Sequence, residues 1–250
     1  MNRAKRDLKK KQVVCVKWGD KYPPYYVNRL YNMVMRSTSY EVDFYCITDD
    51  PHGLNDRISI LPLPDLGLQG WWYKLSLFSN DIYDFQGRLL YIDLDVVIVD
   101  NIDALLDQES NKLIIGEDLQ TGEFNSSVFN LEANSLTEIW TGFLKDRDNI
   151  VTSMHGDQDW ISQFRTGVSA WPSDWIVSYK KQCNARVKHS WGVIGKILRK
   201  TGLMKIKGES AVPKGARIVQ FHGKPDPEDV VNAPYGLYRS APWIKHYWND

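Results

Sequence analysis

Two aspartates lie inside an apolar stretch of the sequence. In RLLYIDLDVVIVD (88–100), Asp93 and Asp95 are flanked on both sides by aliphatic and aromatic residues. Carboxylates placed in a buried strand lose hydration, at a cost of several kcal/mol per ion unless a partner compensates them. Two explanations follow. Either the strand ends at Asp93 and the acids begin a loop, or the two carboxylates hold a cation.

The cation hypothesis gains a third ligand from the motif FHGKP (221–225). Residues i and i+2 of an extended chain point the same way, so both carboxylates can face one ion. Oxygen ligands select a hard cation, Mg²⁺ or Mn²⁺, which keeps open positions for water and phosphates. An imidazole from His222 would favour Mn²⁺. Gly223 would let the backbone approach a phosphate, and Lys224 would bring a positive charge. The alternative is a loop histidine followed by a solvated lysine.

Three further motifs carry polar side chains that could either bind a ligand or have a purely structural role. In HGDQDWI (155–161), Asp157 and Gln158 could hold hydroxyl groups, although Asp157 also suits a helix N-cap. In NSSVF (125–129), Asn125 could hydrogen-bond a sugar, or the segment could form only a turn. In WWYKL (71–75), Lys74 could contact a ligand or extend into solvent.

The elements that must position these residues follow from the apolar periodicity. Strands are predicted at 12–18, 42–50, 58–64, 88–99 and 112–118, with helices at 25–38 and 71–83. This βαβ rhythm predicts an α/β fold with a mostly parallel central sheet flanked by helices. In such sheets, ligands gather beyond the carboxyl ends of the strands. Later in the chain the rhythm loosens, with strands predicted at 125–133 and 216–227 and helices at 136–147 and 156–165.

The charge of the chain is balanced overall but unevenly distributed. Residues 1–11 and 180–207 hold 15 of the 31 Lys and Arg residues, and the remainder carries 16 bases against 30 acids. An acidic body argues against a nucleic-acid groove, and the two basic segments favour a local anionic contact with phosphate or a membrane surface. The mixture of apolar and basic residues in 180–207 suits a peripheral membrane contact, and the alternative is a solvated helix face.

Cysteine usage and hydropathy indicate the compartment. Cys15, Cys46 and Cys183 show no metal-ligand spacing, so reduced thiols are expected. No signal-peptide pattern is found, and no run approaches the roughly 18 apolar residues of a membrane span. We therefore expect a cytoplasmic protein that could contact the inner membrane face through 180–207.

The order of the motifs resembles that of the family-8 glycosyltransferases and related GT-A enzymes, which include bacterial lipooligosaccharide galactosyltransferases and glycogenin. A lysine-bearing helix is followed by YIDLD, FNSSV, GDQD and FHGKP, over roughly residues 12–227. The resemblance implies a GT-A, Rossmann-like nucleotide-diphospho-sugar transferase fold, a UDP-sugar donor and Mn²⁺, with Mg²⁺ as the second choice. The domain prediction is a basic segment (1–11), one catalytic domain (12–227) with a nucleotide-binding half (12–118) and an acceptor-side half (119–227), and an aromatic tail (228–250).

The resemblance also assigns roles to residues. Asp93, Asp95 and His222 would be the metal ligands, the two aspartates forming a DXD motif, and Asp157 and Gln158 would be the catalytic pair beside the reacting sugar. The implied donor-binding residues are Val16, Lys17, Trp18, Gly19, Lys74, Asp93, Leu94, Asp95, Asn125, Ser126, Gly223 and Lys224. The sequence departs from the family at Ser127, where Gly is common, at the compressed His222-Gly223 pair, and at the unusual entry Lys17-Trp18-Gly19-Asp20.

The function that this resemblance implies is transfer of a sugar from a nucleotide sugar to a glycan or lipid-linked acceptor, with retention as in the family. If the reaction inverts the configuration of the transferred sugar, Asp157 or Asp159 would act as the general base. A sugar nucleotidyltransferase is one alternative, but it needs a Gly-rich basic loop after the first strand, which residues 17–20 do not supply. A non-catalytic carbohydrate-binding module is the other, suggested by ten Trp residues. Such modules are usually all-β, which the βαβ rhythm opposes.

Overall fold

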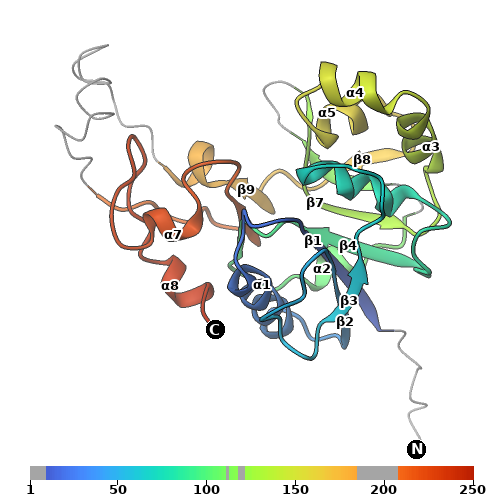
Figure 1. Ribbon diagram of the computed structural model, residues 1–250. Coiled ribbons are helices and arrows are strands. Elements are labelled where there is room, and N and C mark those ends of the chain that lie inside the picture. Colours follow the sequence, from blue (N-terminus) through green and yellow to red (C-terminus); the bar gives the residue numbers. More distant parts are fainter. Residues whose placement is uncertain (1–9, 111–112, 118–121, 185–207) are drawn as a thin grey trace, which may run out of the picture.

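The computed structural model describes residues 10–110, 113–117, 122–184 and 208–250, and a seven-stranded sheet forms its centre (Figure 1). The strand order is β3-β2-β1-β4-β7-β6-β8. Strands β3, β2, β1 and β4 are parallel, β7 is antiparallel to β4 and β6, and β8 is parallel to β6. The predicted α/β fold with a mostly parallel sheet is therefore confirmed. The strands are β1 (Lys11–Lys17), β2 (Val42–Thr48), β3 (Ser59–Pro62), β4 (Arg88–Ile92), β6 (Leu113–Glu117), β7 (Phe124–Glu132) and β8 (Val168–Ala170).

A second, three-stranded sheet has the order β5-β10-β9. Its strands are β5 (Val96–Ile98), β10 (Ile218–Gln220) and β9 (Ile176–Ser178). The apolar run predicted as one strand over 88–99 is thus two strands in different sheets, and that prediction was wrong. The chain changes sheet at Asp93–Leu94–Asp95, where the polar side chains interrupt the apolar pattern.

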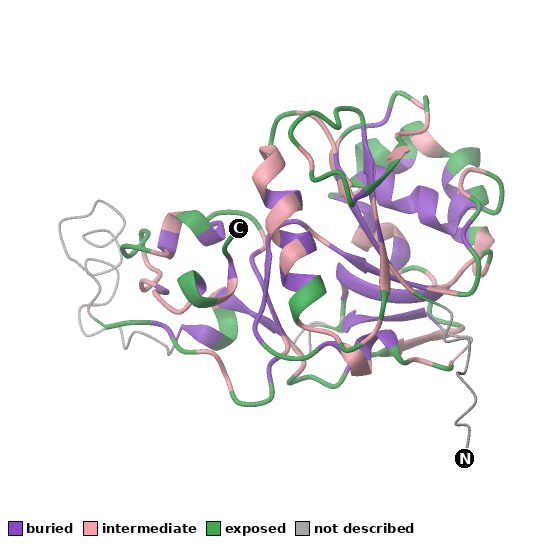
Figure 2. Ribbon diagram, turned by 90° about the horizontal axis from the view of Figure 1, so that it is seen from below, coloured by how far each residue is buried: buried purple, intermediate pink, exposed green. Residues whose placement is uncertain are grey.

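Helices cover both faces of the central sheet (Figure 1). Successive strand residues point to opposite faces, and Val13 and Cys15 of β1 pack in one core cluster with α1, whereas Val14 packs in the other with η1 and α3. Purple buried segments accordingly run through the middle of the molecule in Figure 2. The helical segments here are α1 (Pro24–Arg36), the 3₁₀ helix η1 (Gly70–Phe78), α2 (Asp103–Leu106), α3 (Thr137–Lys145), α4 (Arg147–Ser153) and α5 (Asp157–Ile161).

The C-terminal part of the chain forms a small lobe beside α1 (Figure 1). It holds the π-helix η2 (Tyr179–Cys183) and the short helices α7 (Pro227–Val230) and α8 (Ile244–Tyr247). Residues of the predicted aromatic tail contribute to the α1 core, since Val230, Ala241, Ile244 and Trp248 are buried in that cluster. None of the described helices has the length and apolar character that a membrane crossing requires.

Two predicted segments of the chain can be compared only in part with the structure. The basic segment 180–207 is described only at 180–184, and residues 1–9 of the basic N-terminal segment lie outside the described residues.

All three cysteines are free and buried, as predicted for reduced thiols.

The sheet brings the sequence motifs to one edge. Strands β1 and β4 are parallel and end there, and β7, being antiparallel to β4, begins there. The backbone N–H of Asp93 donates to the carbonyl of Ser127 (2.8 Å), and that of Phe221 donates to the carbonyl of Asp95 (2.9 Å). These two bonds hold the NSSVF and FHGKP motifs beside the two aspartates.

Candidate active site

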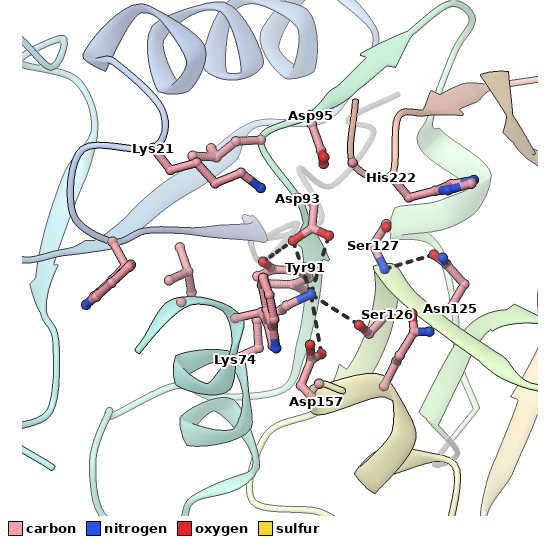
Figure 3. A pocket seen from close by; sticks show the side chains of 18 of the residues that line it. Lys21, Lys74, Tyr91, Asp93, Asp95, Asn125, Ser126, Ser127, Asp157 and His222 are labelled. Carbon is pink, nitrogen blue, oxygen red and sulfur yellow. Dashed lines mark hydrogen bonds and ion pairs between the residues drawn. The ribbon is translucent and has the colours of Figure 1, made fainter. Parts of the chain in front are cut away.

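A pocket of about 390 Å³ opens at this edge of the sheet, and Figure 3 shows the side chains that line it. Most of the residues predicted to be catalytic or to bind donor or metal are brought together here. They are Val16, Trp18, Lys74, Asp93, Leu94, Asp95, Asn125, Ser126, Asp157, Gln158, His222 and Gly223.

Three predicted donor-binding residues do not line this pocket. The Nζ of Lys17 is buried and donates to the carbonyl of Gly19 (3.2 Å), and the N–H of Gly19 donates to the carboxylate of Asp49 (3.1 Å). The exposed Lys224 side chain pairs with Asp226 (3.0 Å) and Asp229 (2.9 Å) at the start of α7. Their roles in donor binding stay predictions.

A buried lysine forms the charged centre of the pocket. The Nζ of Lys74, from η1, lies 3.3 Å from Oδ1 of Asp93 and 3.3 Å from Oδ2 of Asp157, and donates to Oγ of Ser126 (3.1 Å). Tyr91, two residues before Asp93 on β4, donates its hydroxyl to Oδ1 of Asp93 (2.5 Å). The dashed lines in Figure 3 trace this cluster, which joins η1, β4, β7 and α5. We call Lys74, Asp93, Ser126 and Asp157 the lysine cluster.

The protonation states of the cluster follow from burial and from mutual attraction. Burial acts to lower the pKa of Lys74, but the carboxylates of Asp157 and Asp93 outweigh it and raise that pKa above its ordinary value. Burial raises the pKa of Asp157, and the nearby Lys74 ammonium partly offsets the shift. Burial also raises the pKa of Tyr91 well above its usual range, so Tyr91 stays a hydrogen-bond donor. The two neighbouring acids therefore favour the charged form of Lys74.

Asp95 has a different environment, although only one residue separates it from Asp93. Its side chain is buried, and Oδ2 accepts a hydrogen bond from the hydroxyl of Tyr22 (3.0 Å). Burial and then repulsion from Asp93 raise the pKa of Asp95 to about 7, while Lys21 acts in the opposite direction. Asp95 forms no ion pair within the described part of the chain. A buried carboxylate in this situation is stabilised by an added cation.

His222 follows β10 and lines the same pocket, but its ring is directed toward β9. Its Nε2 lies 2.7 Å from Oγ of Ser178, and its backbone carbonyl accepts a hydrogen bond from Nζ of Lys180 (2.7 Å). Figure 3 shows the imidazole extending away from Asp93 and Asp95. Ligation of an ion shared with the aspartates would need the ring to turn.

The oxygen ligands offered by Asp93 and Asp95 fit a hard divalent cation. Among the residues that the structure describes, no three His, Cys, Asp or Glu side chains are already gathered as a ligand set. Asp93 and Asp95 nevertheless line one pocket with His222, and Asp95 lacks a cationic partner at contact distance. Two carboxylates with further positions open is the pattern that Mg²⁺ and Mn²⁺ accept beside phosphates.

The start of α5 places Asp157 in the cluster. Gly156 occupies the N-cap position and Asp157 is the first residue of the helix, so the N-cap interpretation of Asp157 is wrong. A Cβ at position 156 would lie 2.7 Å from Nε1 of Trp71, so a side chain there would displace Trp71. This close approach lets Trp71 form a wall of the pocket next to Asp157.

Several lining residues were missed from the sequence. The predicted nucleotide contact ended at Gly19, but Lys21 and Tyr22 of the same loop also line the pocket. Tyr91 lines it as well and could have been found, since residues i and i+2 of a strand share a face and Tyr91 stands two before Asp93. No pattern in the sequence marks Trp71, which reaches the site through its packing on Gly156.

No protein-family model matches the chain, and no curated protein sequence matches it. Solved glycosyltransferase structures do. The galactosyltransferase LgtC in complex with donor and acceptor sugar analogues gives a TM-score of 0.57 at 16% identity, over 86% of this chain and 88% of LgtC. GlyE of Streptococcus pneumoniae TIGR4, a glycosyltransferase, gives 0.56 at 12% identity, over 96% of this chain and 60% of GlyE. The bifunctional glycosyltransferase WbbM gives 0.58 at 13% identity, over 95% and 51%.

These similarities establish the fold. The chain has the GT-A glycosyltransferase fold, and the resemblance to family-8 and related GT-A enzymes indicated by the motif order is confirmed at that level. The all-β sandwich on which the carbohydrate-binding alternative depended is not the fold of this chain.

Proposed function

We propose that this chain is a metal-dependent glycosyltransferase that moves a sugar from a UDP-sugar to a glycan or lipid-linked acceptor. The observation that carries the proposal is the pairing of two unlike carboxylates at the end of β4. Asp93 forms an ion pair with Lys74, whereas Asp95, within the same pocket, forms no ion pair with a described residue. A GT-A fold with the carboxylate of Asp95 open to a cation at this edge of the sheet supports sugar transfer from a nucleoside-diphosphate sugar.

The chemistry demands stabilisation of a diphosphate leaving group. Mn²⁺ held by Asp93, Asp95 and a reoriented His222 would supply Lewis-acid stabilisation of that charge, with Mg²⁺ as the alternative. Gly223 lines the pocket beside His222 with a positive φ of 65°, so a phosphate can approach the backbone there without a side chain in the way.

The lysine cluster is suited to hold the donor sugar. Asp157 and Lys74 present fixed charges whose own pairing restricts their rotation, and Ser126 and Asn125 add short polar groups from β7. Asp157 or Gln158 would support the oxocarbenium-like centre while the acceptor hydroxyl attacks on the leaving-group face, if the reaction retains configuration. For inversion, Asp157 or Asp159 would accept the proton of the hydroxyl.

A second cavity adjoins the first pocket, and we propose it as the acceptor site. It measures about 620 Å³ and shares Asn125, Gln158 and His222 with the first pocket. Its other lining groups include Glu117, Glu123 and Gln220, so the space is polar and suited to hydroxyl groups.

We also propose that the segment 180–207 contacts a membrane surface. If it carries a lipid-linked acceptor from an anionic surface at the inner membrane face, reversing the charges of Lys196, Arg199 and Lys200 should weaken acceptor use and liposome binding, and leave donor hydrolysis unchanged. These three residues lie outside the described part of the chain. A triple variant that binds anionic liposomes and uses acceptor like the wild type would leave the segment as a solvated face.

The test of the main proposal is a panel of nucleotide sugars incubated with the chain and Mn²⁺, with release of nucleoside diphosphate as the readout. We expect slow hydrolysis of at least one UDP-sugar, lost in chelator and in Asp95→Asn. Release of pyrophosphate from a nucleoside triphosphate and a sugar phosphate would instead support the nucleotidyltransferase. Binding of free glycans without any response to nucleotides would support a binding module.

A further inference from the structure

Two lysines, Lys21 and Lys74, line the pocket among the residues that the structure describes. Lys74 is buried and paired with Asp93 and Asp157. Lys21 is exposed and forms no ion pair with a described residue, and its ammonium lies 4.6 Å from the centroid of the Tyr22 ring. Lys74 is thus occupied by its ion pairs within the protein, whereas Lys21 is available to a ligand.

The loop that carries Lys21 is held at both ends. The N–H of Gly19 donates to Asp49, which holds the beginning of the loop, and the hydroxyl of Tyr22 donates to Asp95, which holds its end. Figure 3 shows the Lys21 side chain extending toward Asp93 and Asp95. Lys21 therefore faces the same place as the two aspartates, from the β1–α1 side.

The other lysines near this edge are engaged elsewhere. The Nζ of Lys17 donates to the carbonyl of Gly19, and that of Lys180 donates to the carbonyl of His222. Lys224 is held by Asp226 and Asp229, and the hydrogen bonds that its ammonium donates to Asp229 and Asp226 raise its pKa above the ordinary lysine value. Moving Lys224 toward the pocket would break two ion pairs at the N-terminus of α7, whereas Lys21 would break none with a described residue.

We propose that Lys21 is the residue whose positive charge contacts the diphosphate of the donor, from the side of the β1–α1 loop. This inference rests on the proposed function, because it assumes that a diphosphate occupies the space between Lys21 and the two aspartates. Lysine suits the task, since its ammonium is a compact charge on a flexible stem that can follow a phosphate oxygen. The ligand class is a nucleoside diphosphate or its sugar ester, bound with a divalent cation.

The test is calorimetric titration of the full chain with two probes, UDP and inorganic pyrophosphate, each in the presence of Mn²⁺. Lys21→Gln should weaken both probes by about tenfold or more, the loss expected for one charge-assisted contact. The factor should be the same for both probes, because the diphosphate is all that they share. Added salt should weaken binding to the wild type more than to this variant, since an exposed charge is screened.

Two variants serve as controls. Lys21→Arg keeps the charge and should bind within about threefold of the wild type. Lys214→Gln removes another exposed lysine that does not line the pocket, and should bind both probes like the wild type. Lys224→Gln gives the direct comparison with the other candidate, and its loss should be smaller than that of Lys21→Gln.

The outcomes separate this inference from the proposed function. If the wild type binds UDP and pyrophosphate and Lys21→Gln binds them equally well, the inference is wrong and the proposed function stands. The inference is also wrong if only UDP is weakened, because Lys21 would then contact the nucleoside, or if Lys224→Gln loses more affinity. If the wild type binds neither probe with Mn²⁺, the proposed function fails and the inference falls with it.

Discussion

The two sides of the pocket balance their charges differently. On the side of η1 and α5, Lys74 lies between Asp93 and Asp157 at 3.3 Å from each, so each of these two carboxylates has a cationic partner within the protein. On the side of the β1–α1 loop, Asp95 has one hydrogen bond from Tyr22 and no ion pair with a described residue. The ion pairs of Lys74 stabilise the fold around the site, whereas the carboxylate of Asp95 is left for a bound cation.

The largest expected effect comes from breaking the compensated side. Lys74→Met leaves the buried Asp157 and the partly buried Asp93 without their shared cation, and removing one partner of a buried ion pair costs about 3–5 kcal/mol. Chemical denaturation should show this loss, accompanied by a clear fall in the melting temperature. Lys74→Arg keeps the charge and should lose less. Wild-type stability in Lys74→Met would show that the cluster is not a structural element.

The opposite result is expected on the uncompensated side. Asp95→Asn should reduce sugar transfer by about 10²-fold or more, since it removes a charge that holds the cation opposite the leaving group. Its melting temperature in chelator should equal or exceed that of the wild type, because the ionised form of Asp95 is disfavoured in the fold. Transfer at the wild-type rate with saturating Mn²⁺ would remove Asp95 from the metal site.

A pH titration should distinguish the two sides without ligand. The pKa of Asp95 is about 7 in the folded chain, above its ordinary value of 3.8, so between these two values the folded state holds a proton that the unfolded state has released. Stability from this group is present below pH 4 and is lost as the pH rises through 7, by at most about 1.4 kcal/mol per pH unit. Denaturant unfolding in chelator should show a steeper decline over this window for the wild type than for Asp95→Asn. Equal slopes would contradict the raised pKa.

The smallest effect should come from the wall of the pocket. In Gly156→Ala the new Cβ would lie 2.7 Å from Nε1 of Trp71, a side chain that is 49% exposed and can move outward. We expect a change in unfolding free energy of less than about 1 kcal/mol, as for exposed sites that can relax. KM for the donor should rise several-fold, because Trp71 lines the pocket beside Asp157. A Trp71→Ala variant with the same KM change would assign the effect to Trp71, and an unchanged KM in both would exclude it.

The sequence predicted much of this pocket because its signals were local. Apolar runs predicted β1, β2 and β4, and polar residues directly after them had to fall at one edge of a parallel sheet. The order of the motifs then identified the fold. The division of 88–99 between two sheets was missed, since the pairing of Val96–Ile98 with β10 depends on residues about 120 positions away.

The remaining misses also depended on contacts between distant segments. Lys224 suited a phosphate in sequence, but Asp226 and Asp229 bring it to α7 through the capping box of that helix. Lys21 stood two residues beyond the predicted contact, and only the bond from Tyr22 to Asp95 places it at the pocket. The turn of His222 toward Ser178 likewise follows from the second sheet, which no local pattern indicated.

The central claim is that the uncompensated side of the pocket binds a diphosphate through a divalent cation, and thermal unfolding with UDP tests it most directly. In the presence of Mn²⁺, UDP at 100 times its dissociation constant should stabilise the wild type by about 2.7 kcal/mol. In chelator, and in Asp95→Asn with Mn²⁺, UDP should give almost no stabilisation. Equal stabilisation of the wild type with and without Mn²⁺, or of Asp95→Asn and the wild type, would contradict the claim.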